Sequence, residues 1–311
     1  MDKKKIKISV ASRSLSSNQV LRFELNAIYE NVQYNELGLK LSGDDLREFL
    51  YDCDKAIVGL EEVDEKLLAQ LPKLKVISKY GVGLDAIDLI ALKKYKIALG
   101  WTPGVNKRSV SELALSMMIS LLRKIPSASE QVKSGIWKQN IGQNLTGKTI
   151  GILGFGNVGK DLAALLEPFN CKILAHDILQ DEKFKEDNLI KYTDLDQLLS
   201  QSDVITLHLP LDLSTKNILN SKKLDLIRPS SVLINTARGG LVDEKVLYKK
   251  LKNEEIAGAA FDVFECEPPV NSKLLELNNF LATPHIGGSS QESILAMGRA
   301  AIHGLENNYI P

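Results

Sequence analysis

Short apolar runs alternate along the chain with longer stretches in which apolar residues recur at helical spacing. This alternation is typical of βαβ units and a parallel sheet. In the first part of the chain the pattern predicts strands at Ile6–Val10, Ala56–Val58, Leu74–Ser78 and Ile97–Leu99, and helices at Asp44–Tyr51 and Asp64–Leu71. A second series of strands is predicted at Thr149–Leu153, Lys172–Ala175, Val204–Leu207, Val232–Asn235, Ala257–Asp262 and Phe280–Ala282. Two such series predict an α/β protein with two similar domains.

A long helix is predicted between the two series. Apolar residues at helical spacing extend over Ser109–Arg123, and Pro126 is expected to end the helix. The segment Leu113–Leu122 is apolar nearly all round, so one face is expected to meet something besides its own domain. It is too short to cross a membrane. A further helix is predicted at Ser290–Glu306, after the last strand, where it can cross back to the first domain.

Composition excludes several classes of protein. A chain of 311 residues is long enough for two domains. Lys+Arg and Asp+Glu number 39 each, and this balance gives no uniform basic surface for nucleic acid. The cysteines Cys53, Cys171 and Cys266 are far apart, so neither a disulfide framework nor a metal site is expected. No signal-peptide core follows the basic start Met1–Lys5, and a cytoplasmic location is expected.

The sharpest local motif is a glycine-rich turn between a predicted strand and a predicted helix, with the spacing G-x-G-x-x-G. Gly154 permits the tight turn, Gly156 lets the backbone approach a pyrophosphate, and Gly159 lets the helix pack closely on the strand. Asp177 ends the next strand, where a carboxylate accepts hydrogen bonds from a ribose diol and repels a 2′-phosphate. NAD is therefore favoured over NADP. The cofactor-binding residues predicted in the turn are Gly154, Phe155, Gly156, Asn157, Val158 and Gly159.

Three further blocks each follow a strand of the second series, and they contain Arg238, the two glutamates Glu265 and Glu267, and His285. They are expected at the carboxyl edge of the sheet, where open α/β sheets bind ligands. The planar fork of an arginine can hold a carboxylate and polarise a neighbouring carbonyl. A histidine can pass a proton to or from a hydroxyl, and a carboxylate beside it orients the ring and favours its charged form.

Together these blocks resemble the D-isomer-specific 2-hydroxyacid dehydrogenases over nearly the whole chain, and in layout the short D-3-phosphoglycerate dehydrogenases that lack a regulatory domain. The matching segments are Lys79–Asp85, Asn106–Glu112, Gly154–Gly159, His208–Leu211, Asn235–Gly240, Phe261–Pro269 and Thr283–Gly288. The resemblance implies two doubly wound parallel-sheet domains: a flavodoxin-like substrate domain of residues 1–101 and 285–311, and a Rossmann NAD-binding domain of residues 102–284. It also implies a homodimer formed through the NAD-binding domain, with the apolar Leu113–Leu122 helix as the expected contact.

The resemblance further implies roles for individual residues. Arg238 would bind the substrate carboxylate and carbonyl, His285 would be the acid/base, and Glu267 would be the partner of His285. The cofactor positions implied outside the glycine turn are Asp177, His208, Pro210, Thr236, Ala237, Asp262 and Gly287. The substrate-binding residues implied are Lys79, Tyr80, Val82, Gly83, Arg238 and His285. The reaction implied is hydride transfer between NAD and C2 of a small D-2-hydroxy acid or 2-oxo acid.

The sequence leaves the substrate side chain open. Phosphoglycerate dehydrogenases often carry an arginine after the strand predicted at Ala56–Val58, where this chain has Gly59-Leu60-Glu61, and an acid there repels phosphate. Lys79 stands where arginine is common. Lys107-Arg108 offers either further positive charge or a solvated helix start. 3-Phosphoglycerate or phosphohydroxypyruvate, hydroxypyruvate and glyoxylate are all candidate substrates.

Three other classes of protein share some or all of this pattern. An enzyme similar to formate dehydrogenase would pair its histidine with a glutamine, which Glu267 argues against. A methyltransferase would use the glycine turn for S-adenosylmethionine but would leave Arg238 and His285 unexplained. A catalytically weak NAD(H)-sensing regulator, similar to the C-terminal-binding corepressors, would share all the motifs and is the main alternative to a dehydrogenase.

Overall fold

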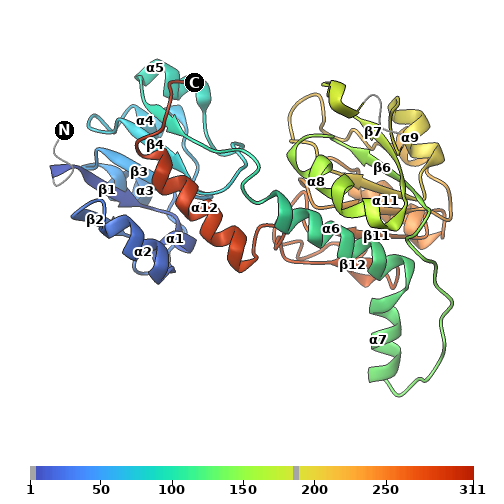
Figure 1. The fold of residues 1–311 in the computed structure, drawn as a ribbon. Coiled ribbons are helices and arrows are strands. Elements are labelled where there is room, and N and C mark those ends of the chain that lie inside the picture. Colours follow the sequence, from blue (N-terminus) through green and yellow to red (C-terminus); the bar gives the residue numbers. More distant parts are fainter. Residues whose placement is uncertain (1–4, 185–188) are drawn as a thin grey trace. The chain divides into compact units, whose positions relative to one another are not determined.

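The computed structural model describes residues 5–184 and 189–311, so the basic start Met1–Lys4 lies outside the described residues. The chain divides into two compact units (Figure 1): a first unit of residues 1–106 and 288–311, and a second unit of residues 107–287. Each unit is built on a parallel β-sheet flanked by helices. The prediction of an α/β protein with two doubly wound sheets is confirmed.

The first unit contains a five-stranded parallel sheet with the strand order β2-β1-β3-β4-β5. This is the flavodoxin-like order, in which ligands bind beyond the carboxyl ends of β1 and β3, where the strand order reverses. The strands are β1 (Lys7–Val10), β2 (Asn31–Tyr34), β3 (Lys55–Val58), β4 (Val76–Lys79) and β5 (Ala98–Gly100). The helices are α1 (Arg13–Ser17), α2 (Gln19–Asn26), α3 (Gly43–Leu50), α4 (Glu65–Leu68), α5 (Leu89–Tyr95) and α12 (Gln291–Gly304).

Helix α12 belongs to the first unit although it lies at the far end of the chain. The Ser78 hydroxyl in β4 donates a hydrogen bond of 2.6 Å to the Ala301 carbonyl. Gly100 and Gly304 bring β5 and α12 together, because a Cβ at Gly100 would lie 2.2 Å from the Gly304 carbonyl oxygen. A helix from the end of the chain therefore packs on a sheet whose strands come from the first hundred residues.

The second unit contains a seven-stranded parallel sheet with the order β12-β11-β10-β9-β6-β7-β8. The strand order reverses at β6, which is the Rossmann arrangement with one added strand. The strands are β6 (Thr149–Leu153), β7 (Lys172–His176), β8 (Ile190–Tyr192), β9 (Val204–Leu207), β10 (Val232–Asn235), β11 (Gly258–Phe261) and β12 (Phe280–Ala282). The helices are α6 (Lys107–Leu122), α7 (Ile125–Lys133), α8 (Asn157–Leu166), α9 (Leu195–Gln201), α10 (Ser221–Leu224) and α11 (Glu244–Lys252), with 3-10 turns at Glu167–Phe169, Glu182–Phe184 and Lys273–Glu276.

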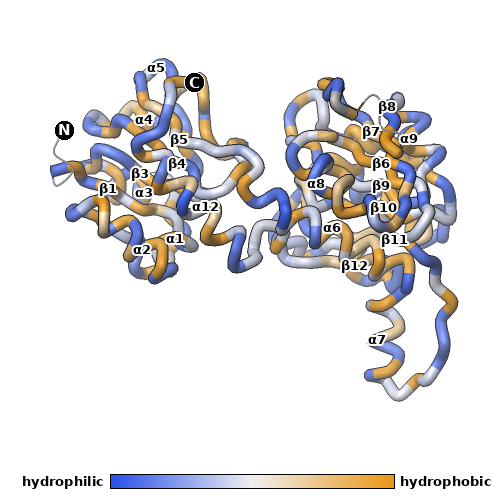
Figure 2. Tube along the Cα trace, viewed as in Figure 1, coloured by the Kyte–Doolittle hydropathy of each residue, from blue (hydrophilic) through white to orange (hydrophobic). Residues whose placement is uncertain are grey.

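The central strands of the second sheet are apolar and buried from end to end. Every residue of β9, β10 and β11 is buried, as expected for strands covered by helices on both faces. Figure 2 shows this as hydrophobic positions gathered along the strands of each unit, with hydrophilic positions on the connecting segments. Such strands have no polar face, so they are recognised from continuous apolar runs rather than from alternation.

The prediction that Pro126 ends the long helix is wrong. Helix α6 ends at Leu122, and Lys124 takes a left-handed conformation with φ of 54°. Pro126 instead lies in the first turn of a new helix, α7, where a proline loses no helical hydrogen bond. Much of the apolar surface of α6 is used inside the second unit, where it packs against α8, β10 and β11.

Candidate active site

The histidine predicted to move a proton lies directly after β12. The His285 amide donates hydrogen bonds to the carbonyls of Asp262 (2.9 Å) and Thr283 (3.0 Å). The imidazole Nδ1 lies 2.8 Å from Glu267 Oε2, and Glu267 Oε1 accepts a hydrogen bond of 3.0 Å from the Phe264 amide. The carboxylate is thus fixed by the backbone and in turn orients the ring. Both side chains stay accessible, with exposed fractions of 49% for His285 and 38% for Glu267.

Asp262 holds the segment that carries the histidine. Its side chain is buried and accepts three hydrogen bonds, from the Thr283 hydroxyl (2.6 Å) and from the amides of Ile286 and Gly287 (2.7 Å each). Both carboxylate oxygens are engaged in this way. The sequence pattern gave no sign of this structural role. The predicted cofactor contacts of Asp262 and Gly287 stay predictions.

Arg238 lies in the turn that follows β10. The Asn235 side chain shapes this turn by donating to the Arg238 carbonyl (2.9 Å) and accepting from the Ala237 amide (3.1 Å). A Cβ at Gly239 would lie 1.9 Å from the Phe264 carbonyl oxygen, so this turn packs backbone to backbone against the segment that holds Glu267. The three predicted catalytic residues therefore come from the carboxyl ends of β10, β11 and β12, which are neighbours in the sheet.

The glycine turn has the three different environments that its spacing predicts. Gly154 has φ of 97°, and a Cβ there would lie 2.6 Å from the His208 carbonyl carbon. A Cβ at Gly159 would lie 2.4 Å from the Gly154 carbonyl oxygen, so only glycine permits this packing of α8 on the turn. A Cβ at Gly156 would meet nothing within 4 Å, which leaves the backbone open to a ligand.

Contacts inside the second unit fix the remaining residues of the glycine turn. The Phe155 ring is buried and packs edge-on against Phe184 and Tyr192, so only its backbone borders the turn. The Asp177 carboxylate accepts hydrogen bonds from the amides of Phe155 (2.7 Å) and Leu179 (2.9 Å). Asn157 and Val158 open α8, whose first amides are free of helical partners. Asp177 therefore lies against the turn, as a ribose-binding acid would.

Two buried polar atoms support a bound dinucleotide. Within residues 5–184 and 189–311, His208 Nδ1 and Thr236 Oγ1 are buried and lack a hydrogen-bond partner. They follow β9 and β10, and buried polar atoms without partners cost about 1–3 kcal/mol each. The other ring nitrogen of His208 lies 3.0 Å from the Thr206 hydroxyl, and burial lowers the pKa of His208 to about 3, which keeps the ring neutral. A polar ligand would satisfy both atoms. Of the other predicted cofactor positions, Ala237 is buried and Pro210 is exposed.

The predicted substrate residues Lys79, Tyr80, Val82 and Gly83 all lie in the first unit, at and after the end of β4. Lys79 and Tyr80 are buried, and the Val82 carbonyl accepts a hydrogen bond of 3.0 Å from the indole of Trp101. Substrate binding by these residues stays a prediction. Of the two other basic candidates, Lys107 is exposed, and Arg108 pairs with buried Asp161 at 3.0 Å and so links α6 to α8.

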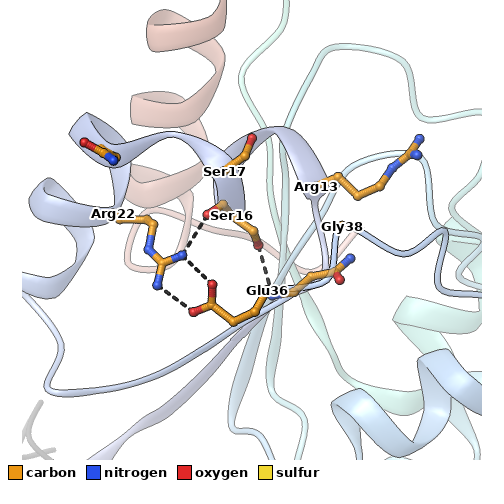
Figure 3. Close-up of a pocket in the computed structure, with 8 residues that line it drawn as sticks. Arg13, Ser16, Ser17, Arg22, Glu36 and Gly38 are labelled. Carbon is orange, nitrogen blue, oxygen red and sulfur yellow. Dashed lines mark hydrogen bonds and ion pairs between the residues drawn. The ribbon is translucent and has the colours of Figure 1, made fainter.

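A hollow of about 320 Å³ in the first unit lies beside α1, α2 and the segment after β2 (Figure 3). Arg22 donates to both carboxylate oxygens of Glu36 at 2.6 and 2.7 Å and to the Ser16 carbonyl at 3.0 Å. The Ser16 hydroxyl accepts from the Asn35 amide at 3.1 Å. Because these groups satisfy one another, the hollow offers no reactive constellation.

The second unit combines a Rossmann sheet, an open glycine turn and an Arg, Glu and His set at the carboxyl edge of the sheet. This combination is typical of NAD-linked oxidoreductases. The family described as "D-isomer specific 2-hydroxyacid dehydrogenase, NAD binding domain" matches residues 115–287. The chain belongs to this family. It is an NAD-dependent oxidoreductase of 2-hydroxy acids, as its resemblance implied.

Three known proteins illustrate the relationship. The chain is 38% identical over 264 residues to the hydroxypyruvate reductase of Thermotoga maritima, covering 83% of this chain and 85% of that one. It is 36% identical over 275 residues to the D-3-phosphoglycerate dehydrogenase of Methanocaldococcus jannaschii, covering 87% of this chain and 52% of that one. The structure of D-lactate dehydrogenase from Aquifex aeolicus, solved with NAD and lactic acid, superposes with a TM-score of 0.84 at 27% identity, covering 95% and 93%.

Among the described residues, no helix combines the length and the apolar content needed to cross a lipid bilayer.

Proposed function

We propose that the enzyme interconverts a small 2-oxo acid and its D-2-hydroxy acid, with Arg238, Glu267 and His285 as its reactive groups. The observation that carries this proposal is the 2.8 Å contact between His285 Nδ1 and Glu267 Oε2 at the edge of an NAD-binding sheet. The names of the relatives, hydroxypyruvate reductase and phosphoglycerate dehydrogenase, support substrates of this size.

Each side chain has a separate task in the proposed mechanism. NAD, when bound, supplies the site that accepts or delivers the hydride. Because Nδ1 of His285 is engaged by Glu267, Nε2 is the atom that donates a proton to the ketone oxygen in reduction and takes it from the hydroxyl in oxidation. Arg238 would hold the substrate carboxylate and stabilise negative charge that develops on the reacting oxygen. Glu267 holds the orientation of the His285 ring through Nδ1.

The proposal is tested by following NADH absorbance with 3-phosphohydroxypyruvate, hydroxypyruvate, glyoxylate and pyruvate, each repeated with NADPH. We expect turnover of at least one of these acids with NADH. NADPH should be the poorer cofactor, because the Asp177 carboxylate would repel its 2′-phosphate. Tight NADH binding without turnover of any acid would instead support the NAD(H)-sensing regulator.

Changing Glu267 to glutamine is expected to lower kcat for reduction by about 10²-fold, because the amide can donate to Nδ1 of His285 and so hold the ring in the wrong tautomer. Glutamine keeps the shape of the side chain. The measurement is kcat for reduction of the best 2-oxo acid. Glu265→Gln removes the same charge from an exposed neighbour and serves as the control. An unchanged kcat in Glu267→Gln would remove Glu267 from its assigned role.

We propose that the enzyme is a homodimer formed through α7 and the segment after it. No residue of α7 is buried, and α7 stands out from the second unit in Figure 1. Trp137 and Ile141 are exposed by 87% and 90%, and Ile125, Val132 and Ile136 are about half exposed. Such a set of large apolar side chains is typical of a protein interface. The family resemblance favours a second copy of this chain as the partner. These apolar side chains would then form the contact that the sequence analysis expected of α6.

Changing Trp137 to glutamate is therefore expected to convert a dimer into a monomer, because a charge would be buried in the centre of the contact. Light scattering coupled to gel filtration measures the mass. Leu213→Glu, at a fully exposed apolar position outside this set, is the control and should leave the mass unchanged. A monomeric wild-type protein would contradict the homodimer.

We place the enzyme in the cytoplasm. The three cysteines are free thiols, two of them buried, as is usual for proteins of a reducing compartment.

A further inference from the structure

A glutamate outside the predicted site holds the backbone beside Glu267. Glu244 lies in the first turn of α11, and its Oε1 accepts a hydrogen bond of 2.7 Å from the Glu265 amide. The preceding amide, that of Phe264, donates to Glu267 Oε1 at 3.0 Å. Two consecutive amides of the segment after β11 are therefore bound by two carboxylates, one of them from the site and the other from α11.

Helix α11 gives Glu244 a fixed position. Asp243 caps the helix by accepting hydrogen bonds from two of its first amides, at 3.0 and 3.1 Å. Leu247 and Leu251 are buried and anchor α11 in the core of the second unit. Residues 265–268, in contrast, are all exposed. The Glu244 carboxylate thus ties a surface segment to a firmly packed helix.

Glu244 makes this contact at an electrostatic cost. Burial raises the pKa of the Glu244 carboxyl, the bond from the Glu265 amide opposes that rise, and the carboxylates of Glu265 and Glu267 add to it. A partly buried carboxylate beside two others is unfavourable unless hydrogen bonds to its charged form offset the cost. The bond to the Glu265 amide is the interaction that does so here. A neutral acceptor of the same shape would make that bond without the repulsion.

The position of this segment decides whether Glu267 reaches the histidine. Glu267 Oε2 lies 2.8 Å from His285 Nδ1. Hydrogen bonds of this kind extend to about 3.2 Å, so a displacement of the segment by about 1 Å would break the contact. The ring would then lose the group that sets which of its nitrogens carries the proton. Misplacement of a reacting group by about 1 Å can lower a rate by about 10²-fold.

We propose that Glu244 is a positioning residue, which holds the Glu265 amide so that Glu267 keeps His285 oriented through Nδ1. This inference rests on the proposed function, in which Nε2 of the same ring exchanges a proton with the substrate. Glu244 acts through Glu267 and contacts neither substrate nor cofactor in this scheme. Its loss should therefore lower kcat and leave substrate binding nearly unchanged.

The first test compares Glu244→Leu and Glu244→Gln with the wild-type enzyme. Leucine removes the acceptor and should lower kcat by about 10- to 100-fold, while KM for the 2-oxo acid changes by less than about threefold. Glutamine still accepts from the Glu265 amide and should keep kcat within about threefold of the wild type. Glu167→Leu, at an exposed glutamate of the second unit, is the matched control and should leave both constants unchanged.

Glu244→Ala is a second test, because it removes the acceptor without adding a large apolar side chain at the start of a helix. It should show the same loss of kcat, with the active sites counted by NADH binding. A kcat within about threefold of the wild type in both the leucine and the alanine variant overturns the inference. An equal loss in Glu244→Gln and Glu244→Leu also overturns it, since glutamine keeps the bond.

Nuclear magnetic resonance of the His285 ring nitrogens measures the positioning without turnover, with His285→Asn used to assign the signals. At a pH where the ring is neutral, the wild-type protein with NAD bound should carry the proton on Nδ1, whereas Glu244→Leu should show a mixture of the two tautomers. An unchanged tautomer in Glu244→Leu overturns the inference, as does a wild-type ring protonated on Nε2. The expected change in a protein that reduces no 2-oxo acid would overturn the proposed function and leave the positioning role supported.

Discussion

Replacing His285 by asparagine is expected to lower kcat by about 10³-fold in both directions. A positioned acid or base contributes about 10²–10⁴-fold to proton transfer, and asparagine cannot take or give the proton. Asparagine is the suitable replacement because His285 has φ of 55°, a left-handed conformation that asparagine tolerates better than alanine does. Steady-state kinetics with NADH and the best 2-oxo acid measure the effect.

The control for this variant is His303→Asn, at an exposed histidine of α12 in the first unit. It should keep the wild-type kcat. Thermal unfolding of both variants checks that the fold is retained. A His285→Asn enzyme within tenfold of the wild-type rate would exclude His285 as the acid/base.

Replacing Arg238 by glutamine is expected to lower kcat/KM by about 10³-fold, with KM raised and kcat reduced. The two effects are expected together because the guanidinium would bind the carboxylate in the ground state and also stabilise the charge that develops on the reacting oxygen. The turn itself should persist, because Asn235 and Gly239 shape it through the backbone.

Arg123→Gln, at an exposed arginine just after α6, removes the same charge elsewhere in the second unit and should leave both constants unchanged. Calorimetry with NADH distinguishes a loss of substrate binding from a loss of cofactor binding. In Arg238→Gln the affinity for NADH should fall far less than kcat/KM for the 2-oxo acid. An unchanged KM for the 2-oxo acid would contradict the assigned carboxylate contact of Arg238.

The sequence predicted the central strands and the edge strands β5 and β12, but it missed the edge strands β2 and β8. Strands such as β9 and β10 are buried on both faces, so their apolar runs are unmistakable. Strands β2 and β8 each pair on one side only and read Asn-Val-Gln-Tyr and Ile-Lys-Tyr, which carry little apolar signal. Their existence depends on a neighbouring strand being present, and local pattern does not contain that information.

The same limit applies to the site. The family resemblance of the motifs singled out Arg238, Glu267 and His285, and the fold brings their three strands side by side. The support that Asp262 gives to the His285 segment could not be predicted, because it joins residues more than twenty positions apart through hydrogen bonds to main-chain amides. The burial of Glu61 was equally hidden, since a glutamate in a loop is ordinarily exposed.

The split origin of the first unit has a consequence for synthesis. The bond from Ser78 to Ala301 spans 223 residues, and the close contact of Gly100 with Gly304 spans a similar length. On the ribosome, strands β4 and β5 emerge early, but the helix that covers them emerges only after the whole second unit has been made. The second unit is therefore the first to be complete, while one apolar face of the nascent first sheet is covered only in part, by α1 and α2. That interval is when the chain most needs protection from aggregation.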